Sequence, residues 1–265
     1  EAISWHLAEE LKLDAKKTQL GLEAVFAVAG KETWVTGLHF TNAALSPEFE
    51  NVFNAFNAKK IDFKYSEGMK KLFDLQINYA KKPVNSVDYS TQVEKLFSLG
   101  KVAFMQQGNW TLGAIKGIDE ELAANIGFLP MPIVGAKEDS IPVGIPMYWT
   151  VNSTKDEKTQ AAAKAFLNWM YTSEKGKDAI INKFGFIPPF KGFDSPDLQP
   201  KDALAKDIMK YASAGKTIQW VFMGYPSGWG MEKIGVDLQK YVDGKLTWDQ
   251  LIENGKKSWE EARKQ

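Results

Sequence analysis

The extended segments of this sequence are short, and helical segments separate them. The run from Val102 to Met105 is apolar, follows Gly100 and leads into the polar residues Gln106 and Gln107. An apolar run bounded by glycine is typical of a buried strand. Further extended segments are expected at 126–131 and 141–151. Short strands that alternate with helices predict an α/β fold with a central sheet.

Helices are predicted from the spacing of apolar residues and from their cap residues. Apolar side chains three and four positions apart predict helices over 66–79, 90–99 and 201–211. N-cap residues predict further helix starts at Ser4, Ser46, Thr154, Ser173 and Thr247, with capping boxes at Thr154–Glu157 and Thr247–Gln250. The helix after Ser46 is expected to turn Phe53 and Phe56 inward, and residues 33–42 are expected to form a loop or a strand.

Charge and composition exclude several classes of function. Lys plus Arg and Asp plus Glu are 33 each, so the chain lacks the basic excess that favours a nucleic acid or an anionic membrane. No apolar run approaches the roughly 18 residues of a membrane span. With no cysteine and only two histidines, no metal site and no cofactor is expected.

Aromatic residues gather in four segments that glycine or proline interrupts. The chain has nine Trp, eight Tyr and sixteen Phe, and the four segments are 33–42, 106–110, 144–149 and 220–229. Each is expected to be a loop after an extended segment. Ligand sites of open α/β sheets lie beyond the carboxyl ends of the strands, so the four segments are predicted to meet at one cleft.

Five runs of sequence together resemble a known family. In order, they are FSLGKVAFMQQGNW, IGFLPMPIVG, IPVGIPMYWTVNSTKDEKTQAAAKAFLNWM, YTSEKGKDAIINKFGFIPP and GWGMEKIGVDLQKYVDGKLTWDQLIENGKKSW. The set resembles the extracellular solute-binding proteins of carbohydrate ABC importers, which include the maltose- and raffinose-type binding proteins. The resemblance extends over roughly residues 1 to 265. It implies a periplasmic-binding-protein-like type II fold, in which two α/β lobes joined by crossing strands close on a sugar.

The same resemblance implies how the chain divides between the lobes. Residues 1–128 and 205–265 would form the second lobe, and residues 129–204 would belong to the first. Family members begin with a strand and a helix of the first lobe, whereas the segment from Glu1 to Leu13 resembles the helix after the first crossover. The first lobe is therefore expected to be incomplete, and to be completed by a missing segment or by a second chain.

The resemblance also implies aromatic ligand contacts. Trp110 aligns with an aromatic residue that stacks on a sugar ring, Trp229 with one in a loop that opens a helix near the ligand, and Trp34 with a looser motif. In the pair Tyr148 and Trp149, only one side chain of an extended segment faces the cleft, and Tyr148 is preferred. The alternative for each of these residues is a place in the core.

Three polar side chains offer donors and acceptors for sugar hydroxyls: Asn109, Gln107 and His39. A lone histidine is more often structural than functional. The expected function is the binding of a sugar or oligosaccharide and its delivery to the permease subunits of an ABC importer. The expected location is extracellular, periplasmic or, as a lipoprotein, at the cell surface, because a signal segment is cleaved from the mature chain.

Two alternative functions remain at this stage: a glycoside-active enzyme and a stand-alone carbohydrate-recognition module. Glycosidases need two carboxylates about 5–10 Å apart. The acidic residues Glu48, Glu157 and Asp249 lie where helix starts explain them. No nucleophile elbow or phosphate loop is present in the sequence. No catalytic residue is therefore expected, and a recognition module would differ from the importer protein only in its partner.

Overall fold

The computed structural model describes residues 13–145, 148–188, 190–193, 195–198 and 201–264. The first half of the chain contains α2 (Leu13–Lys16), β1 (Ala24–Ala27), η1 (Val35–Phe40), α3 (Thr41–Phe49), α4 (Val52–Asn57), α5 (Ser66–Asn78), η2 (Val84–Ser86), η3 (Thr91–Phe97), β2 (Val102–Met105), η4 (Asn109–Thr111), α6 (Leu112–Ile118) and α7 (Glu120–Asn125). The η elements are short 3₁₀- or π-helical turns.

The second half contains β3 (Ile141–Val143), α8 (Glu157–Thr172), α9 (Glu174–Asp178), η5 (Ala179–Lys183), η6 (Pro196–Leu198), α10 (Ala203–Ser213), β4 (Thr217–Gln219), η7 (Val221–Gly224), η8 (Trp229–Ile234), α11 (Gly235–Val242) and α12 (Trp248–Ala262). Helices therefore dominate an α/β fold, as the sequence predicts.

Two parallel strand pairs make up the sheet structure of the described residues. β1 pairs with β2, with Ala24 opposite Val102 and Ala27 opposite Met105. β3 pairs with β4, with Ile141 opposite Thr217. Residues 126–131 form no strand, so the extended segment predicted there does not pair. The single central sheet expected from the sequence is thus replaced, over the described residues, by two small ones.

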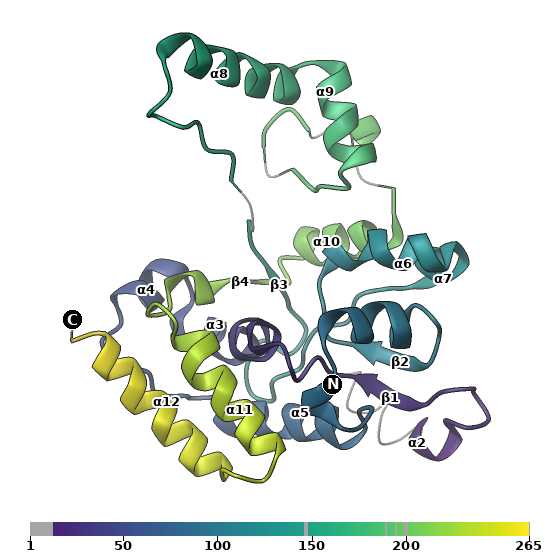
Figure 1. The fold of residues 1–265 in the computed structure, drawn as a ribbon, viewed down its shortest axis with the longest axis vertical. Coiled ribbons are helices and arrows are strands. Elements are labelled where there is room, and N and C mark those ends of the chain that lie inside the picture. Colours follow the sequence, from purple (N-terminus) through teal and green to yellow (C-terminus); the bar gives the residue numbers. More distant parts are fainter. Residues whose placement is uncertain (1–12, 146–147, 189, 194, 199–200, 265) are drawn as a thin grey trace.

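The main core joins segments from both halves of the chain. Its largest fully buried side chains include Phe40, Phe73, Trp229, Trp259 and Leu251. A second, separate core lies in residues 157–198, the α8–α9 unit, and contains Met170, Ile180, Ile181 and Phe193. Figure 1 shows α8 and α9 set apart from the other helices. We call the other helices, with the two strand pairs, the main body. A hydrophobic core of its own is the first sign that the α8–α9 unit is a separate structural unit.

Residues 131–136 do not follow the lobe division expected from the sequence. Ile133 is 1% exposed and packs in the main core, together with Met131 and Ala136. These residues fall within 129–204, the segment assigned to the first lobe. The described structure therefore places 131–136 with the main body, and the rest of the expected division stays a prediction.

Two local predictions in the first third of the chain are wrong. Residues 33–42 are helical, and the helical segment runs on through Ser46 to the end of α3. The next helix is α4, which Asn51 caps by accepting a hydrogen bond from the Asn54 amide at 2.9 Å. Phe53 and Phe56 are 73% and 61% exposed, because α4 buries Ala55 instead. Tertiary packing here overrides the local proline and cap signals.

Of the other predicted helix starts, some are confirmed and one is wrong. The capping box of Thr247 and Gln250 and the Ser173 cap are confirmed. Helices are likewise confirmed at 66–78, 91–97 and 203–213. α8 instead begins after Asp156, whose carboxylate accepts from the Thr159 amide at 3.0 Å. Its negative charge makes Asp156 a stronger acceptor than Thr154, and Thr154 bonds to Asn152. The helix expected at Ser4 lies outside the described residues.

Candidate ligand-binding site

Six aromatic rings from distant parts of the main body form one cluster. We call this set the aromatic cluster: Trp34, His39, Tyr89, Trp110, Trp220 and Phe222. His39 lies at its centre, with ring centroids 4.8 Å from Phe222, 5.2 Å from Trp220, 5.3 Å from Trp110 and 5.7 Å from Trp34. Trp34 also lies 6.3 Å from Trp110 and 6.0 Å from Tyr89. The cluster is therefore continuous.

Strand ends and helix starts position these rings. Trp110 lies in η4, shortly after β2, and Trp220 directly follows β4. These two rings lie 6.4 Å apart beyond the carboxyl ends of their strands, where the sequence predicts a site. Trp34 and His39 lie on the helical segment that contains η1, rather than on a loop after a strand. Three of the four predicted aromatic segments thus contribute rings to one site.

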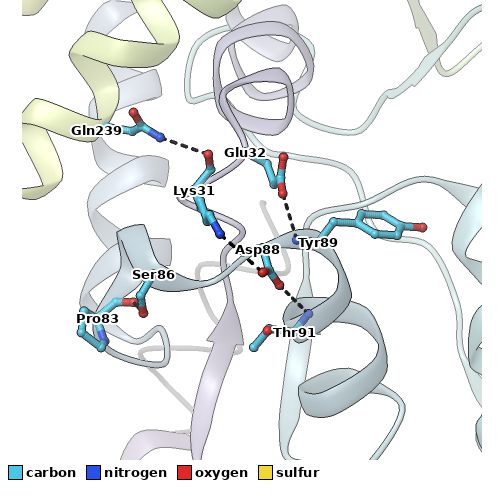
Figure 2. Close-up of polar contacts among 8 residues, drawn as sticks. All are labelled: Lys31, Glu32, Pro83, Ser86, Asp88, Tyr89, Thr91 and Gln239. Carbon is cyan, nitrogen blue, oxygen red and sulfur yellow. Dashed lines mark hydrogen bonds and ion pairs between the residues drawn. The ribbon is translucent and has the colours of Figure 1, made fainter.

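Polar contacts hold the segments of Trp34 and Tyr89 together (Figure 2). The Lys31 ammonium lies 3.7 Å from the Asp88 carboxylate, and the backbone amide of Tyr89 donates to the Glu32 carboxylate at 3.4 Å. Asp88 also accepts from the Thr91 amide at 2.9 Å, and this hydrogen bond is the main cause that lowers its pKa. The backbone on both sides of the Trp34–Tyr89 contact is therefore fixed.

A chain of hydrogen bonds sets the orientation of Trp110. Its indole N–H donates to the Gln107 side-chain oxygen at 3.2 Å, and the Gln107 amide donates to Gln92 at 2.7 Å. The buried Gln92 amide donates in turn to the carbonyl of Ala27 in β1 at 2.7 Å. The indole also lies against Gly108, where a Cβ atom would lie 2.0 Å from it. Trp110 remains 40% exposed, so part of its ring is open to solvent.

His39 is electrically neutral at the centre of the cluster. Burial lowers the pKa of its imidazole from 6.5 to about 4. Burial also raises the pKa of the neighbouring Tyr89 hydroxyl, which stays protonated. Neutral imidazole offers one donor and one acceptor. Within the described residues, its ring nitrogens have no hydrogen-bond partner.

Asn42 fixes the backbone on both sides of Trp220. This fully buried side chain donates to the carbonyl of Gln219 at 3.0 Å and accepts from the Phe222 amide at 3.3 Å. The Trp220 indole N–H is itself buried without a partner. A buried donor without a partner is unusual in a folded protein, and the Trp248 indole N–H in the main core is another.

The helical segment of His39 packs closely on the element that carries Trp229. A Cβ atom on Gly37 would lie 1.9 Å from the carbonyl oxygen of Gly230, and one on Gly230 would lie 2.2 Å from a methyl carbon of Leu38. The absence of two side chains therefore allows η1 and η8 to touch through their backbones.

The structure brings most of the predicted ligand residues together. Trp34, His39 and Trp110 belong to the cluster, and Gln107 is hydrogen-bonded to Trp110. The Gln107 oxygen and amide nitrogen are both engaged by protein groups. Asn109 is half-buried beside Trp110, and its side chain makes no hydrogen bond within the described residues. It is the amide side chain best able to bind an added ligand.

The prediction that Trp229 contacts a ligand is wrong for this structure. Trp229 is 1% exposed, and its indole N–H donates to the Gly255 carbonyl at 3.1 Å and to the Ser258 hydroxyl at 3.0 Å. Its ring packs edge-on against Tyr225 and Trp259. The flanking glycines serve a turn and a close helix contact, and they leave Trp229 free to enter the core.

Tyr148 and Trp149 do not join the cluster either. Tyr148 is 69% exposed and makes no ring contact within the described residues. The Trp149 indole donates to the Tyr171 hydroxyl of α8 at 2.8 Å. Trp149 therefore lies towards the α8–α9 unit, and the preference for Tyr148 as a ligand contact stays a prediction.

Sequence reasoning missed three members of the cluster: Tyr89, Trp220 and Phe222. Trp220 could have been found, because it is the first aromatic residue after a strand, as Trp110 is after β2. Phe222 follows two positions later in the same segment. Tyr89 carries no comparable signal, since it lies at the start of an ordinary helical segment.

Other kinds of site find little support. In the part of the chain that the structure describes, no group of three His, Cys, Asp or Glu side chains is placed to hold a metal ion. A hollow of about 330 Å³ lies away from the cluster, and its lining includes Lys17, Glu23 and Lys81. Glu23 in this hollow is paired with lysines, and hydrogen bonds from Lys101 and Lys81 lower its pKa to about 2. No described helix combines the length and apolarity needed to cross a bilayer.

The family model and the solved structures that match this chain are described below. A family model described as bacterial extracellular solute-binding protein matches residues 9–227. Among solved structures, a chitin oligosaccharide binding protein has a TM-score of 0.70 at 19% identity over 96% of this chain. A manno-oligosaccharide-specific solute-binding protein of Bifidobacterium animalis subsp. lactis, in complex with mannotriose, has a TM-score of 0.64 at 22% identity over 96%. The apo form of RafE from Streptococcus pneumoniae has a TM-score of 0.63 at 14% identity over 95%.

These likenesses confirm the solute-binding-protein fold expected from the sequence. The chain spans only 63%, 62% and 63% of the length of those three structures. No curated protein matches the sequence.

Proposed function

Since this chain belongs to the bacterial extracellular solute-binding proteins, we propose that its solute is an oligosaccharide and that the aromatic cluster binds the sugar rings. The observation that carries this proposal is the convergence of five aromatic side chains and a neutral histidine in one cluster, at the carboxyl ends of β2 and β4.

Sugars match the chemistry of this cluster. One side of a pyranose presents C–H groups that pack on an aromatic face, and its edge presents hydroxyls. Trp110 and Trp34 supply ring faces, and the unpaired groups of His39, Asn109 and Trp220 supply donors and acceptors. A neutral His39 offers no charge to attract an ionic ligand. These features favour an uncharged glycan.

The structural relatives support the same ligand class. One is named for chitin oligosaccharide, and another holds mannotriose. Their identities of 19% and 22% show a shared fold, so the choice of sugar rests on the cluster itself.

We further propose that the α8–α9 unit belongs to the first lobe, and that residues 1–128 and 205–265 form the second lobe, which carries the cluster. Its separate core and its place in Figure 1 support this division. Permease subunits of an ABC importer are the proposed partner, and the proposed location of the protein is extracellular, periplasmic or, as a lipoprotein, the cell surface. Aromatic faces would retain the sugar until its delivery.

Calorimetric titration with mannotriose, chitotriose, maltotriose and raffinose tests the proposed function. Trp110→Ala should weaken binding of the accepted sugar about tenfold or more, because a central aromatic anchor contributes strongly to affinity. Trp149→Ala is the matched control, since Trp149 is also exposed but lies outside the cluster. No heat with any of the four sugars, or equal losses in the two variants, would contradict the proposal.

The enzymatic alternative has a direct test. The matched family and the structural relatives are binding proteins. Incubation of the same sugars with the protein should leave them intact when the products are separated by chromatography. Shortened oligosaccharides, absent after heat denaturation of the protein, would assign the cluster to a glycoside-active enzyme instead. Failure to associate with any permease, despite sugar binding, would favour the stand-alone recognition module.

A further inference from the structure

Two amide side chains, Gln92 and Gln107, connect the Trp110 ring to the last residue of strand β1. We call this pair the amide relay. Its hydrogen bonds run from the Trp110 indole through both side chains to the Ala27 carbonyl, at 3.2, 2.7 and 2.7 Å. Ala27 is fully buried, whereas Trp110 is partly open to solvent. The relay therefore joins the interior of the main body to the surface of the aromatic cluster.

The two ends of the amide relay fix the direction of every hydrogen bond in it. A backbone carbonyl only accepts a hydrogen bond, and an indole N–H only donates one. The Gln92 amide nitrogen must therefore face Ala27, which leaves its oxygen to accept from Gln107. The Gln107 oxygen is then the atom that faces Trp110. Neither amide can turn over without the loss of two hydrogen bonds.

The relay holds one end of the indole, and Gly108 limits the other. Three carbon atoms of the six-membered ring lie 2.0–2.4 Å from the place of a Cβ atom on Gly108, so this part of the ring rests on the glycine backbone. The five-membered ring carries the N–H that donates to Gln107. Because both ends of the indole are held, the plane of the ring is set before any ligand binds.

Gln92 has no direct access to a ligand. Its side chain is 0% exposed, and both of its polar atoms bond to protein groups. Without Gln92, the Gln107 amide would be free to turn, and Trp110 would lose its fixed acceptor. The influence of Gln92 on a ligand must therefore pass through Trp110.

We propose that Gln92 is a positioning residue, which acts through Gln107 to hold Trp110 in the orientation that binds the ligand. A side chain that is already ordered loses less conformational freedom on binding, and this raises affinity without a new contact. The effect on affinity rests on the proposed function. The hydrogen-bonded orientation of Trp110 in the free protein does not.

The indole N–H signals of a ¹H–¹⁵N nuclear magnetic resonance spectrum report on the relay without any ligand. Trp110→Phe identifies the Trp110 signal, because that signal disappears. Gln92→Met has a similar volume but no amide, so the Trp110 signal should shift or broaden as its acceptor becomes mobile. Gln76→Met is the matched control, since Gln76 is also a buried glutamine but lies on α5, outside the relay. Circular dichroism checks that each variant is folded.

Gln92→Glu tests the direction of the relay. A carboxylate cannot donate to the Ala27 carbonyl, whereas a protonated carboxyl donates there and still accepts from Gln107. Burial raises the pKa of a carboxyl, so the Trp110 signal of this variant should lie at its wild-type position when the pH is lowered to about 5. A signal that stays displaced at this pH would contradict the stated direction of the hydrogen bonds.

Titration with the accepted sugar completes the test. Gln92→Met should weaken binding about threefold to tenfold, because the ring must then be ordered on binding, and Gln76→Met should not. An unmoved Trp110 signal in Gln92→Met, or a shift no larger than in Gln76→Met, would overturn the role of Gln92. A displaced signal with unchanged affinity would overturn it as well. A protein that binds none of the sugars would contradict the proposed function and leave the signal test standing.

Discussion

Two aromatic clusters of similar composition lie in the main body, and their polar atoms distinguish them. In the core cluster, the indole N–H groups of Trp229 and Trp259 donate to protein oxygens, and the Tyr225 hydroxyl lies 3.3 Å from that of Thr41. In the aromatic cluster, the Trp220 N–H and the His39 ring nitrogens lack partners within the described residues. An unpaired buried N–H is not specific to the aromatic cluster, because Trp248 in the main core has one too. The aromatic cluster differs from the core cluster in also exposing part of Trp110 to solvent.

The largest expected difference between the clusters is in stability. Trp259→Ala should lower the free energy of unfolding by about 3–5 kcal/mol, because it empties a fully buried site. Trp110→Ala should cost less than about 1 kcal/mol, since its ring is partly exposed. Urea unfolding followed by circular dichroism measures both. Similar losses in the two variants would remove the distinction between core and site.

Acid should act on the aromatic cluster through His39. The pKa of His39 in the folded protein, about 4, lies below its ordinary value of 6.5, so the unfolded chain binds the proton first. Stability is then full above pH 6.5 and falls as the pH drops towards 4, by on the order of 2 kcal/mol.

Unfolding of His39→Gln across the same pH range provides the comparison, and its stability should fall less. Loss of the Glu23 ion pairs falls in a lower window, between pH 4.5 and about 2, because the pKa of that carboxyl is lowered. Parallel curves for the wild type and His39→Gln would show that His39 is not the acid-sensitive group.

A conservative pair of substitutions isolates the indole N–H groups. Trp229→Phe removes an N–H that donates hydrogen bonds to two oxygens, whereas Trp220→Phe removes an N–H that has no hydrogen-bond partner. Both changes remove the same volume. Trp229→Phe should therefore cost about 1–2 kcal/mol more in urea unfolding than Trp220→Phe. The reverse order would mean that the Trp220 N–H has a partner in solution.

The smallest effect is expected where an aromatic side chain is exposed but belongs to neither cluster. Tyr148→Ala should change the free energy of unfolding by no more than about 0.5 kcal/mol. Its effect on the sugar affinity tests the predicted ligand contact, because a residue outside the binding surface would leave that affinity unchanged. The same calorimetric titration used for Trp110→Ala measures the affinity. A marked loss of affinity would extend the binding surface to residue 148 and restore that part of the sequence prediction.

Local signals predicted local structure well. The strand at 102–105, the α5 and α12 helices and the Ser173 cap follow from residue patterns within one or two turns. Such elements depend on contacts between near neighbours, which the sequence displays directly.

Several of the failures share one physical cause, which is contact between distant segments. Trp229 enters the core because Gly230 packs against η1, almost two hundred residues earlier in the chain. The segment 33–42, predicted as a loop or a strand, is helical and takes part in the same contact with Gly230. The site was half predicted: Trp34, His39 and Trp110 were named, whereas Tyr89 gave no local signal. Whether an aromatic residue between glycines is buried depends on the distant segment that packs against it, and the local sequence does not show that segment.

The backbone contact between Gly37 and Gly230 has a consequence for the evolution of this chain. It lies between the two clusters, with His39 on one side and Trp229 on the other. A mutation that adds a side chain at either glycine would disturb the core and the binding surface in one step. Selection on stability and selection on ligand affinity therefore act on the same two codons, and sequence drift at one position cannot proceed independently of the other.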